Sequence, residues 1–131
     1  MPHDNAAIEA MAKAYTDAWN SGSAAAVAAH FSSGGRIVIN NGAPYQGRAG
    51  VEEMANGFFT GVPDLSLVCE GVRAAGPHVV YLWKFTGHDS GTGNPLAISG
   101  WEEWDLGPDL KIESSRGWYD ADDYARQVEG R

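Results

Sequence analysis

The sequence predicts an α+β fold in which helices cover one face of a strongly bent antiparallel sheet. Two observations carry this prediction. Apolar residues in the first part of the chain recur at the 3.6-residue spacing of helices, and residues after Pro63 alternate with the period of two that is typical of strands. With one short strand among the helices, the predicted order is helix, helix, strand, helix and then four strands.

Helix signals occur at four places. The first helix begins at the N-cap candidate Asp4 and ends at residues 20–22. Its inward-facing stripe contains Ile8, Met11, Ala12, Tyr15 and Trp19. Ser23 caps a short second helix that reaches about residue 31 and is broken by residues 32–35. Helical spacing returns at residues 47–59, and one or two final helical turns are expected at residues 122–128.

Strand signals fill most of the remaining chain. The predicted strands are residues 36–40, 65–74, 79–87, 96–106 and 112–119. The clearest is 79–87, in which Tyr81, Trp83 and Phe85 share one face and Lys84 lies on the other. We therefore expect the aromatic face to point inward and the lysine face to be the wetter one.

Length and charge limit the classes of protein. At 131 residues the chain is expected to form one domain spanning residues 1–131. Nine Lys and Arg against 17 Asp and Glu give a net charge of −8, which argues against nucleic acid or a membrane as partner. No apolar run approaches the roughly 20 residues that span a bilayer, and no signal peptide is recognisable. The lone cysteine, Cys69, fits a cytoplasmic protein without a disulfide.

Four segments spanning nearly the whole chain carry a resemblance to a known family. They are AYTDAWNSGSAAAVAAHF at residues 14–31, YQGRAGVEEM at 45–54, VVYLWKFTGH at 79–88 and LKIESSRGWYD at 110–120. The chain resembles the nuclear-transport-factor-2-like superfamily, in its branch of SnoaL-like polyketide cyclases, ketosteroid isomerases and limonene-type epoxide hydrolases. The resemblance implies a cone-shaped half-barrel with the N-terminal helices over its concave face and a deep apolar pocket inside. It also implies a homodimer formed through the outer face of the sheet.

The strand faces and the resemblance together predict the lining of that pocket. Ligand pockets of this kind are apolar and rich in aromatic side chains. The expected pocket residues are Trp19, Asn40, Phe58, Tyr81, Trp83, Phe85, Trp104 and Gly117. The aromatic members of this set would serve equally well as ordinary core residues.

Glu102 and Tyr15 are the main candidate catalytic residues. Within SGWEEWDL, at residues 99–106, the alternation turns Glu102 and Trp104 to one face and Glu103 to the other. The resemblance places Glu102 where ketosteroid isomerases carry the carboxylic acid of their oxyanion hole, and Tyr15 where they carry the donating tyrosine. Burial among aromatic rings would raise the pKa of Glu102, so that it could donate a hydrogen bond. A one-residue change of register would put Glu103 inside instead, and Tyr15 would also fit as a plain core tyrosine.

Two bases of the resembled families are missing. Asn40 stands where ketosteroid isomerases have their general-base aspartate, and an amide cannot abstract a proton. Gly117 stands where SnoaL-like cyclases have a catalytic aspartate on the last strand, and it enlarges the pocket. His88, followed by Asp89 at the expected pocket mouth, is a third catalytic candidate because imidazole titrates near neutrality. A solvated loop histidine is the alternative interpretation.

The sequence thus predicts a pocket for a small hydrophobic molecule and leaves its use open. One hypothesis is a cofactor-independent isomerase, dehydratase or cyclase acting on an oxygenated apolar metabolite of polyketide, steroid or terpenoid type. Another is a non-catalytic ligand-binding or regulatory module that has lost the general base, and a third is a structural domain whose pocket is filled by Trp83 and Trp104. The four histidines show no metal-ligand spacing, so neither a metal nor a cofactor is expected.

Overall fold

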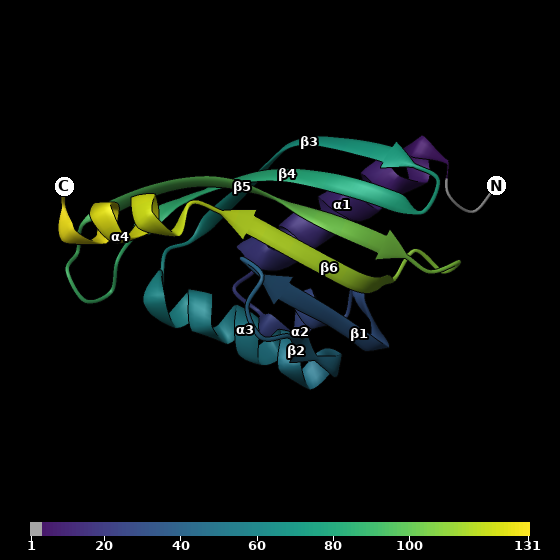
Figure 1. The fold of residues 1–131 in the computed structure, drawn as a ribbon, viewed down its shortest axis with the longest axis horizontal. Coiled ribbons are helices and arrows are strands. Elements are labelled where there is room, and N and C mark those ends of the chain that lie inside the picture. The colour runs from purple at the N-terminus through teal and green to yellow at the C-terminus, as the bar shows by residue number, and fades with distance from the viewer. Residues whose placement is uncertain (1–3) are drawn as a thin grey trace.

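The computed structural model describes residues 4–131, which form four helices and a six-stranded sheet (Figure 1). In chain order the elements are α1 (Asn5–Asn20), α2 (Ala24–Ala28), β1 (Phe31–Ile39), β2 (Tyr45–Gln46), α3 (Gly47–Gly61), β3 (Ser66–Ala75), β4 (His78–His88), β5 (Pro95–Leu106), β6 (Ile112–Tyr119) and α4 (Ala121–Glu129). The predicted α+β class is confirmed. No helix in the described part of the chain has the length and apolarity needed to cross a membrane.

The strands lie in the order β2-β1-β6-β5-β4-β3. The sheet is mostly antiparallel, as predicted, and the one exception is the pair β1 and β6, which run parallel. The pairing sets three residues side by side across the middle of the sheet, because Glu102 on β5 lies opposite Tyr81 on β4 and Gly117 on β6. This register determines what surrounds the candidate carboxylate.

The two N-terminal helices begin at the predicted caps. The Asp4 side chain accepts a hydrogen bond from Ala7 N at 2.7 Å, and the Ser23 side chain accepts one from Ala26 N at 3.1 Å. The apolar stripe of α1 is buried, and this helix packs on β3 while α3 packs on β1 and α2. In Figure 1 α1 passes behind the strands, so its inward-facing side chains meet the interior face of the sheet.

Two boundaries near the start of the sheet differ from expectation. Helix α2 ends at Ala28, and β1 already begins at Phe31, whereas residues 32–35 were expected to be a break. The reason is the close approach of β1 to β6: a Cβ at Gly35 would lie only 2.7 Å from the Ile112 carbonyl oxygen. Glycine here permits this close approach, and the extended backbone continues through residues 32–35, where the register between β1 and β6 shifts. The two-residue strand β2 was not predicted.

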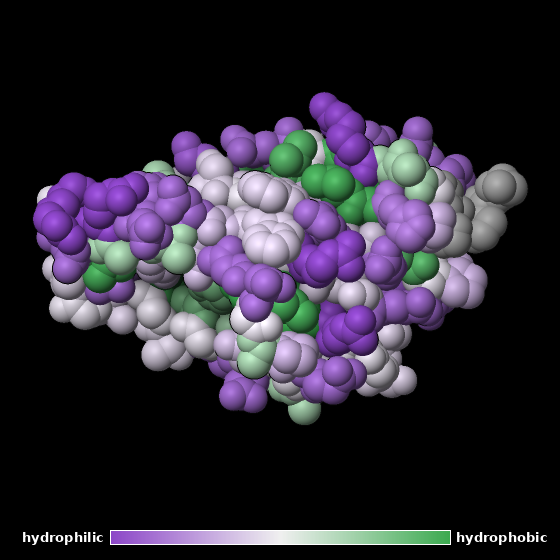
Figure 2. All heavy atoms as spheres, viewed as in Figure 1, coloured by the Kyte–Doolittle hydropathy of each residue, from purple (hydrophilic) through white to green (hydrophobic). Residues whose placement is uncertain are grey.

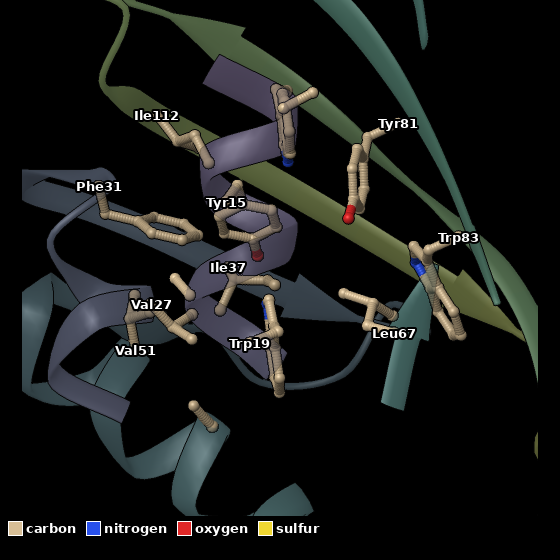
Figure 3. Packing of buried hydrophobic residues seen from close by; sticks show 14 of the residues in the cluster. Tyr15, Trp19, Val27, Phe31, Ile37, Val51, Leu67, Tyr81, Trp83 and Ile112 are labelled. Carbon is tan, nitrogen blue, oxygen red and sulfur yellow. The ribbon is translucent and has the colours of Figure 1, made fainter. Parts of the chain in front are cut away.

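Aromatic side chains dominate the core between α1 and the sheet (Figure 3). The ring of Tyr15 meets Tyr81 and Trp104 edge-on, at centroid distances of 5.4 and 5.1 Å, and Tyr81 stacks on Trp104 at 4.8 Å. Trp83 and Phe85 are buried as well, whereas Lys84 is half-buried on the opposite face. The predicted face assignment of β4 is confirmed.

Candidate functional site

The side chain of Glu102 lies inside the molecule, on the interior face of β5. The residue is 7% exposed, and Glu103 beside it is half-buried on the opposite face. Three neutral donors reach the Glu102 carboxylate. Trp104 Nε1 donates to Oε1 at 2.9 Å and Ser115 Oγ at 2.8 Å, while the Tyr15 hydroxyl lies 3.1 Å from both oxygens. The predicted register, with Glu102 inside, is confirmed.

The environment of Glu102 increases its affinity for a proton. Burial raises the pKa of its carboxyl, and the hydrogen bonds from Trp104, Ser115 and Tyr15 act in the opposite direction because they stabilise the charged form. None of the ion pairs found within residues 4–131 includes Glu102. A carboxyl with a raised pKa and no cationic partner keeps its proton to a higher pH than an exposed one, which makes Glu102 a candidate acid–base group.

Tyr15 contacts Glu102 and belongs to the packed core around it. The residue is fully buried, and its hydroxyl donates to the Glu102 carboxylate. Burial first, and then the charge of Glu102, raise the pKa of Tyr15 well above its usual range, so the phenol stays protonated. The expected donor to a substrate oxygen is therefore, in this structure, a donor that orients Glu102.

Glu102 lines an inner cavity of about 50 Å³. Its wall is formed by Trp19, Ile37, Ile39, Met54, Phe58, Leu65, Leu67, Trp83, Phe85, Glu102, Gly117 and Tyr119. A cavity of this size holds a few water molecules or one end of a larger molecule, since a single water needs roughly 10–15 Å³ by the same measure. The inner cavity is thus far narrower than the deep pocket that the resemblance implies.

An outer groove adjoins the inner cavity. The groove is open, with a volume of about 550 Å³, and is lined by Ile39, Gly42, Ala43, Pro44, Tyr45, Met54, Gly57, Phe58, Tyr119 and Tyr124. Four of these residues, Ile39, Met54, Phe58 and Tyr119, also line the inner cavity. The site therefore has two parts, a narrow, largely apolar end that contains the carboxylate and a wide, open end lined by both apolar residues and tyrosines.

Five of the predicted pocket residues line the inner cavity: Trp19, Phe58, Trp83, Phe85 and Gly117. The missing side chain at Gly117 does leave space, because a Cβ there would lie 3.7 Å from Glu102 Cγ, an ordinary contact. Tyr81 and Trp104 lie behind the wall. The hydroxyl of Tyr81 is hydrogen-bonded to Thr16, and Trp104 binds Glu102.

Asn40 and His88 are placed differently from expectation. Asn40 joins strand ends, because its Oδ1 accepts from Tyr119 N at 3.0 Å and its backbone N donates to the Gly117 carbonyl at 2.8 Å. His88 is exposed, with Nδ1 2.6 Å from Asp64 Oδ2, and neither residue lines the inner cavity or the groove. Asp89 accepts from the backbone of its own turn, so the expected proximity of His88 and Asp89 does not make them a pair.

Several residues of the site were not found from the sequence. Ser115 binds Glu102 only because β6 pairs with β5, and Ile37 and Leu67 reach the cavity from opposite ends of the sheet. Burial of alternate residues in β1 and β3 would have been the signal for the latter two, but it does not reveal which face contains a cavity. Within residues 4–131, no three His, Cys, Asp or Glu side chains group in a way that could hold a metal ion.

The comparisons with known proteins agree with this architecture. The profile of the SnoaL-like domain family matches residues 12–114. The chain belongs to the SnoaL-like domain family. No curated protein matches this SnoaL-like chain.

Solved structures share its ketosteroid-isomerase-like fold at low sequence identity. A protein of Catenulispora acidiphila DSM 44928, solved with trimethylamine, has a TM-score of 0.83 at 20% identity, covering 91% of this chain and 92% of that one. A protein of Jannaschia sp. CCS1 assigned as a SnoaL-like polyketide cyclase has a TM-score of 0.80 at 19% identity, covering 98% and 99%. TerC, co-crystallised with polyporic acid, has a TM-score of 0.80 at 15% identity, covering 94% and 98%. These identities establish the fold and not the reaction.

Proposed function

We propose that this SnoaL-like protein is a cofactor-independent acid–base enzyme in which Glu102 exchanges a proton with a small, oxygenated, largely apolar molecule. One observation carries the proposal: a buried carboxyl, bound by three neutral donors and by no cation, lies on the wall of a cavity. Burial of an ionisable group is energetically unfavourable, and such groups concentrate at functional sites. The small-molecule enzymes that share the fold support the same class of substrate.

The two oxygens of Glu102 have different roles in this proposal. Oε1 accepts hydrogen bonds from Trp104 and Ser115. Oε2 has only the Tyr15 hydroxyl as a donor, and that hydroxyl lies equally close to Oε1. Oε2 is therefore the oxygen that takes a proton from the ligand, while the bonds to Oε1 keep the carboxylate in place. The same proton can return to another atom of the ligand, so isomerisation, dehydration and cyclisation need no second protein base.

A non-catalytic ligand-binding module is the second candidate. Two observations favour it: Asn40 and Gly117 occupy the positions of bases in the resembled families, and the inner cavity is narrow. A protein of this kind would bind the same class of ligand and release it unchanged.

Conversion of candidate ligands distinguishes the two functions. We would incubate the protein with a panel of hydroxylated polyketides, terpenoids and hydroxyquinones, including polyporic acid, and follow both binding and product formation. Thermal shift reports binding, and chromatography with NMR detects isomers that mass alone would miss. The enzyme proposal expects at least one ligand to be converted, and Glu102→Gln to slow that conversion by about 100-fold or more.

Glu103→Gln is the matched control, since Glu103 is the adjacent carboxylate on the outer face. It is expected to leave conversion unchanged. Full conversion by Glu102→Gln would contradict the assignment of the acid–base role to Glu102. Binding of panel members with no conversion of any would favour the non-catalytic module.

A further inference from the structure

Trp19 contributes a buried hydrogen-bond donor that has no acceptor. The residue is 7% exposed, it lines the inner cavity, and its Nε1 is buried without a hydrogen-bond partner. Buried polar groups in proteins nearly always have a partner, so an orphaned N–H on a cavity wall calls for an explanation. A ligand atom in the cavity would supply the missing acceptor.

The Trp19 N–H lies near the Tyr15 hydroxyl, which is the group that binds the candidate carboxylate. Figure 3 shows the indole nitrogen at the end of the ring that faces the Tyr15 hydroxyl. Burial and the charge of Glu102 raise the pKa of Tyr15, and the nearby Trp19 N–H acts against them. The Tyr15 hydroxyl in turn lies 3.1 Å from both Glu102 oxygens. Trp19 lies one helical turn after Tyr15 on α1, so its N–H is directed toward the hydroxyl that binds Glu102.

The carboxylate has spare accepting capacity at this point. Each carboxylate oxygen can accept about two hydrogen bonds. Glu102 Oε1 accepts from Trp104 and Ser115, whereas Oε2 shares the single proton of the Tyr15 hydroxyl. The inner cavity thus presents one unpaired donor, Trp19 Nε1–H, and one underused acceptor, Glu102 Oε2.

We propose that Trp19 is the second polar anchor of the site, and that the ligand carries a phenol or enol hydroxyl bound between Trp19 and Glu102. A hydroxyl matches the pair because its oxygen accepts from Nε1–H while its proton points to Oε2. An ammonium group cannot accept from the indole, and a carbonyl would match only the protonated form of Glu102, so the hydroxyl is the group that matches its carboxylate form. This inference rests on the proposed function and names the group on which Glu102 acts.

The same geometry makes Trp19 useful during proton transfer. When the ligand O–H bond breaks, the proton moves to Glu102 Oε2 and the electron pair stays on the ligand oxygen. The negative charge that develops there is stabilised by the Trp19 N–H, a fixed donor in a site of low polarity. Trp19 would then take the part that the resemblance gives to Tyr15.

The dimensions of the site determine the shape of the ligand. The inner cavity, at about 50 Å³, admits only the hydroxyl-bearing end, and the remainder extends into the groove of about 550 Å³. Phe58 and Tyr119 line both parts and would contact an aromatic body. A rod-shaped phenol such as 4-phenylphenol is therefore a suitable probe, and biphenyl is its counterpart without the hydroxyl.

Binding of these two probes by calorimetry tests the inference. We expect the wild-type protein to bind 4-phenylphenol about tenfold more tightly than biphenyl, as one or two buried hydrogen bonds would give. Trp19→Phe keeps an aromatic ring in contact with Phe58 and Phe59 but removes the N–H. It is expected to reduce the preference to about twofold or less, and the ratio corrects for any change in cavity size.

Trp118→Phe is the matched control, because Trp118 Nε1 is also buried without a partner but lines neither part of the site. This variant should keep the full preference for the phenol. A preference that survives in Trp19→Phe, or a wild-type protein that binds 4-phenylphenol no better than biphenyl, would overturn the inference.

NMR of the wild-type protein gives a readout that does not depend on a variant folding. The indole ¹H–¹⁵N signal of Trp19 should move downfield on addition of 4-phenylphenol and stay in place with biphenyl, since only the phenol offers an acceptor. An unmoved signal in the phenol-bound protein would overturn the role of Trp19 even if Glu102 proves catalytic. A moved signal without conversion of any substrate would keep the binding inference and remove the catalytic proposal.

Discussion

Among single residues, the response of Glu102 to pH separates it from its neighbour Glu103. Burial raises the pKa of Glu102 above its ordinary value of 4.5, so between the unfolded and folded pKa values the folded protein binds more protons. The contribution of Glu102 to the free energy of unfolding is therefore largest below pH 4.5 and decreases as the pH rises toward the folded pKa. We expect Glu102→Gln to remove this decrease, so that the variant gains stability relative to wild type with rising pH. Urea unfolding at a series of pH values measures the difference.

Glu103→Gln should change the pH dependence in the opposite sense. The hydrogen bond from Trp101, and after it Arg116, lower the pKa of Glu103, so its stabilisation is present above the ordinary value and is lost on acidification. With rising pH, the free energy of unfolding relative to wild type should therefore increase for Glu102→Gln and decrease for Glu103→Gln. Parallel curves for wild type and Glu102→Gln across the whole range would mean that the pKa of Glu102 is not raised by folding.

Gly117 and Gly100 are predicted to tolerate a methyl group very differently. A Cβ at Gly117 would contact Glu102 Cγ and Ile39 Cγ1 at 3.7 and 3.8 Å, so Gly117→Ala should change stability by less than about 0.5 kcal/mol. It would also narrow the inner cavity and weaken binding of 4-phenylphenol severalfold.

A Cβ at Gly100 would lie 2.3 Å from the Trp118 carbonyl and 2.5 Å from the Trp83 ring, so Gly100→Ala should destabilise the protein by about 1–3 kcal/mol. Chemical denaturation checks both values, and equal effects would contradict the packing described here.

The sequence predicts the orientation of Glu102 but not the partners of its carboxylate. Orientation follows from the period of two within β5, which is a local property of the chain. Ser115 and Tyr15 are 13 and 87 residues away in sequence and meet Glu102 only through strand pairing and helix packing. The cavity volume is still less predictable, because it is the small space left by side chains from many elements.

Among the elements, helix α4 contacts the sheet through the ring of Tyr124, which packs on Phe85 and Tyr119, and through the side chain of Gln127. Gln127 Oε1 accepts from Ala97 N at 2.7 Å and Nε2 donates to Ala97 O at 3.1 Å, so its amide pairs with β5 as a neighbouring strand would. The helix also contributes Tyr124 to the outer groove. We therefore expect the contact of Gln127 with Ala97 to help hold Tyr124 in place at the groove.

Gln127→Ala should loosen α4 and lower the free energy of unfolding by about 1–2 kcal/mol, because two hydrogen bonds to a strand are lost. Hydrogen exchange should become faster at the Ala97 amide and along residues 121–129. Arg126→Ala is the control on the same helix, since Arg126 pairs only with the exposed Asp123 side chain and the ends of its own helix. Equal exchange at Ala97 in both variants would show that Gln127 does not anchor the helix.

The elements also show which local signals predict structure and which do not. The caps Asp4 and Ser23 and the long strands β3 to β6 were predictable, because each depends on residues close together in sequence. The start of β1 was not, since Ser-Ser-Gly-Gly at residues 32–35 is typical of a loop when its neighbour is unknown. Parallel pairing with β6 on both sides of this segment, at Phe31 and from Arg36 onward, carries the strand across it.

At the scale of the whole molecule, the outer face of the sheet shows how the protein is expected to assemble. Trp101 on β5 is 40% exposed and lies opposite Trp118 on β6, and Val68 on β3 is 56% exposed. Figure 2 is viewed from the side opposite α1 and shows apolar residues among charged ones. Trp101 Nε1 already donates to Glu103 at 3.0 Å, so this side chain can be covered without losing a hydrogen bond. We therefore predict a homodimer formed through this face, as the family resemblance implies.

Sedimentation tests this assembly and its location together. The wild-type protein is expected to sediment as a dimer at micromolar concentration, which requires roughly 1,600 Å² of total buried surface with apolar residues at its centre. Trp101→Lys would bring a buried charge into that centre and should shift the protein to monomer. Glu53→Lys, on the exposed side of α3, introduces the same side chain away from the sheet and should leave the dimer intact.

The inner cavity lies on the opposite side of the sheet from Trp101. A monomeric Trp101→Lys variant should therefore still bind 4-phenylphenol. A wild-type monomer, or a Trp101→Lys dimer, would show that the exposed tryptophan does not mark an interface between copies of this chain.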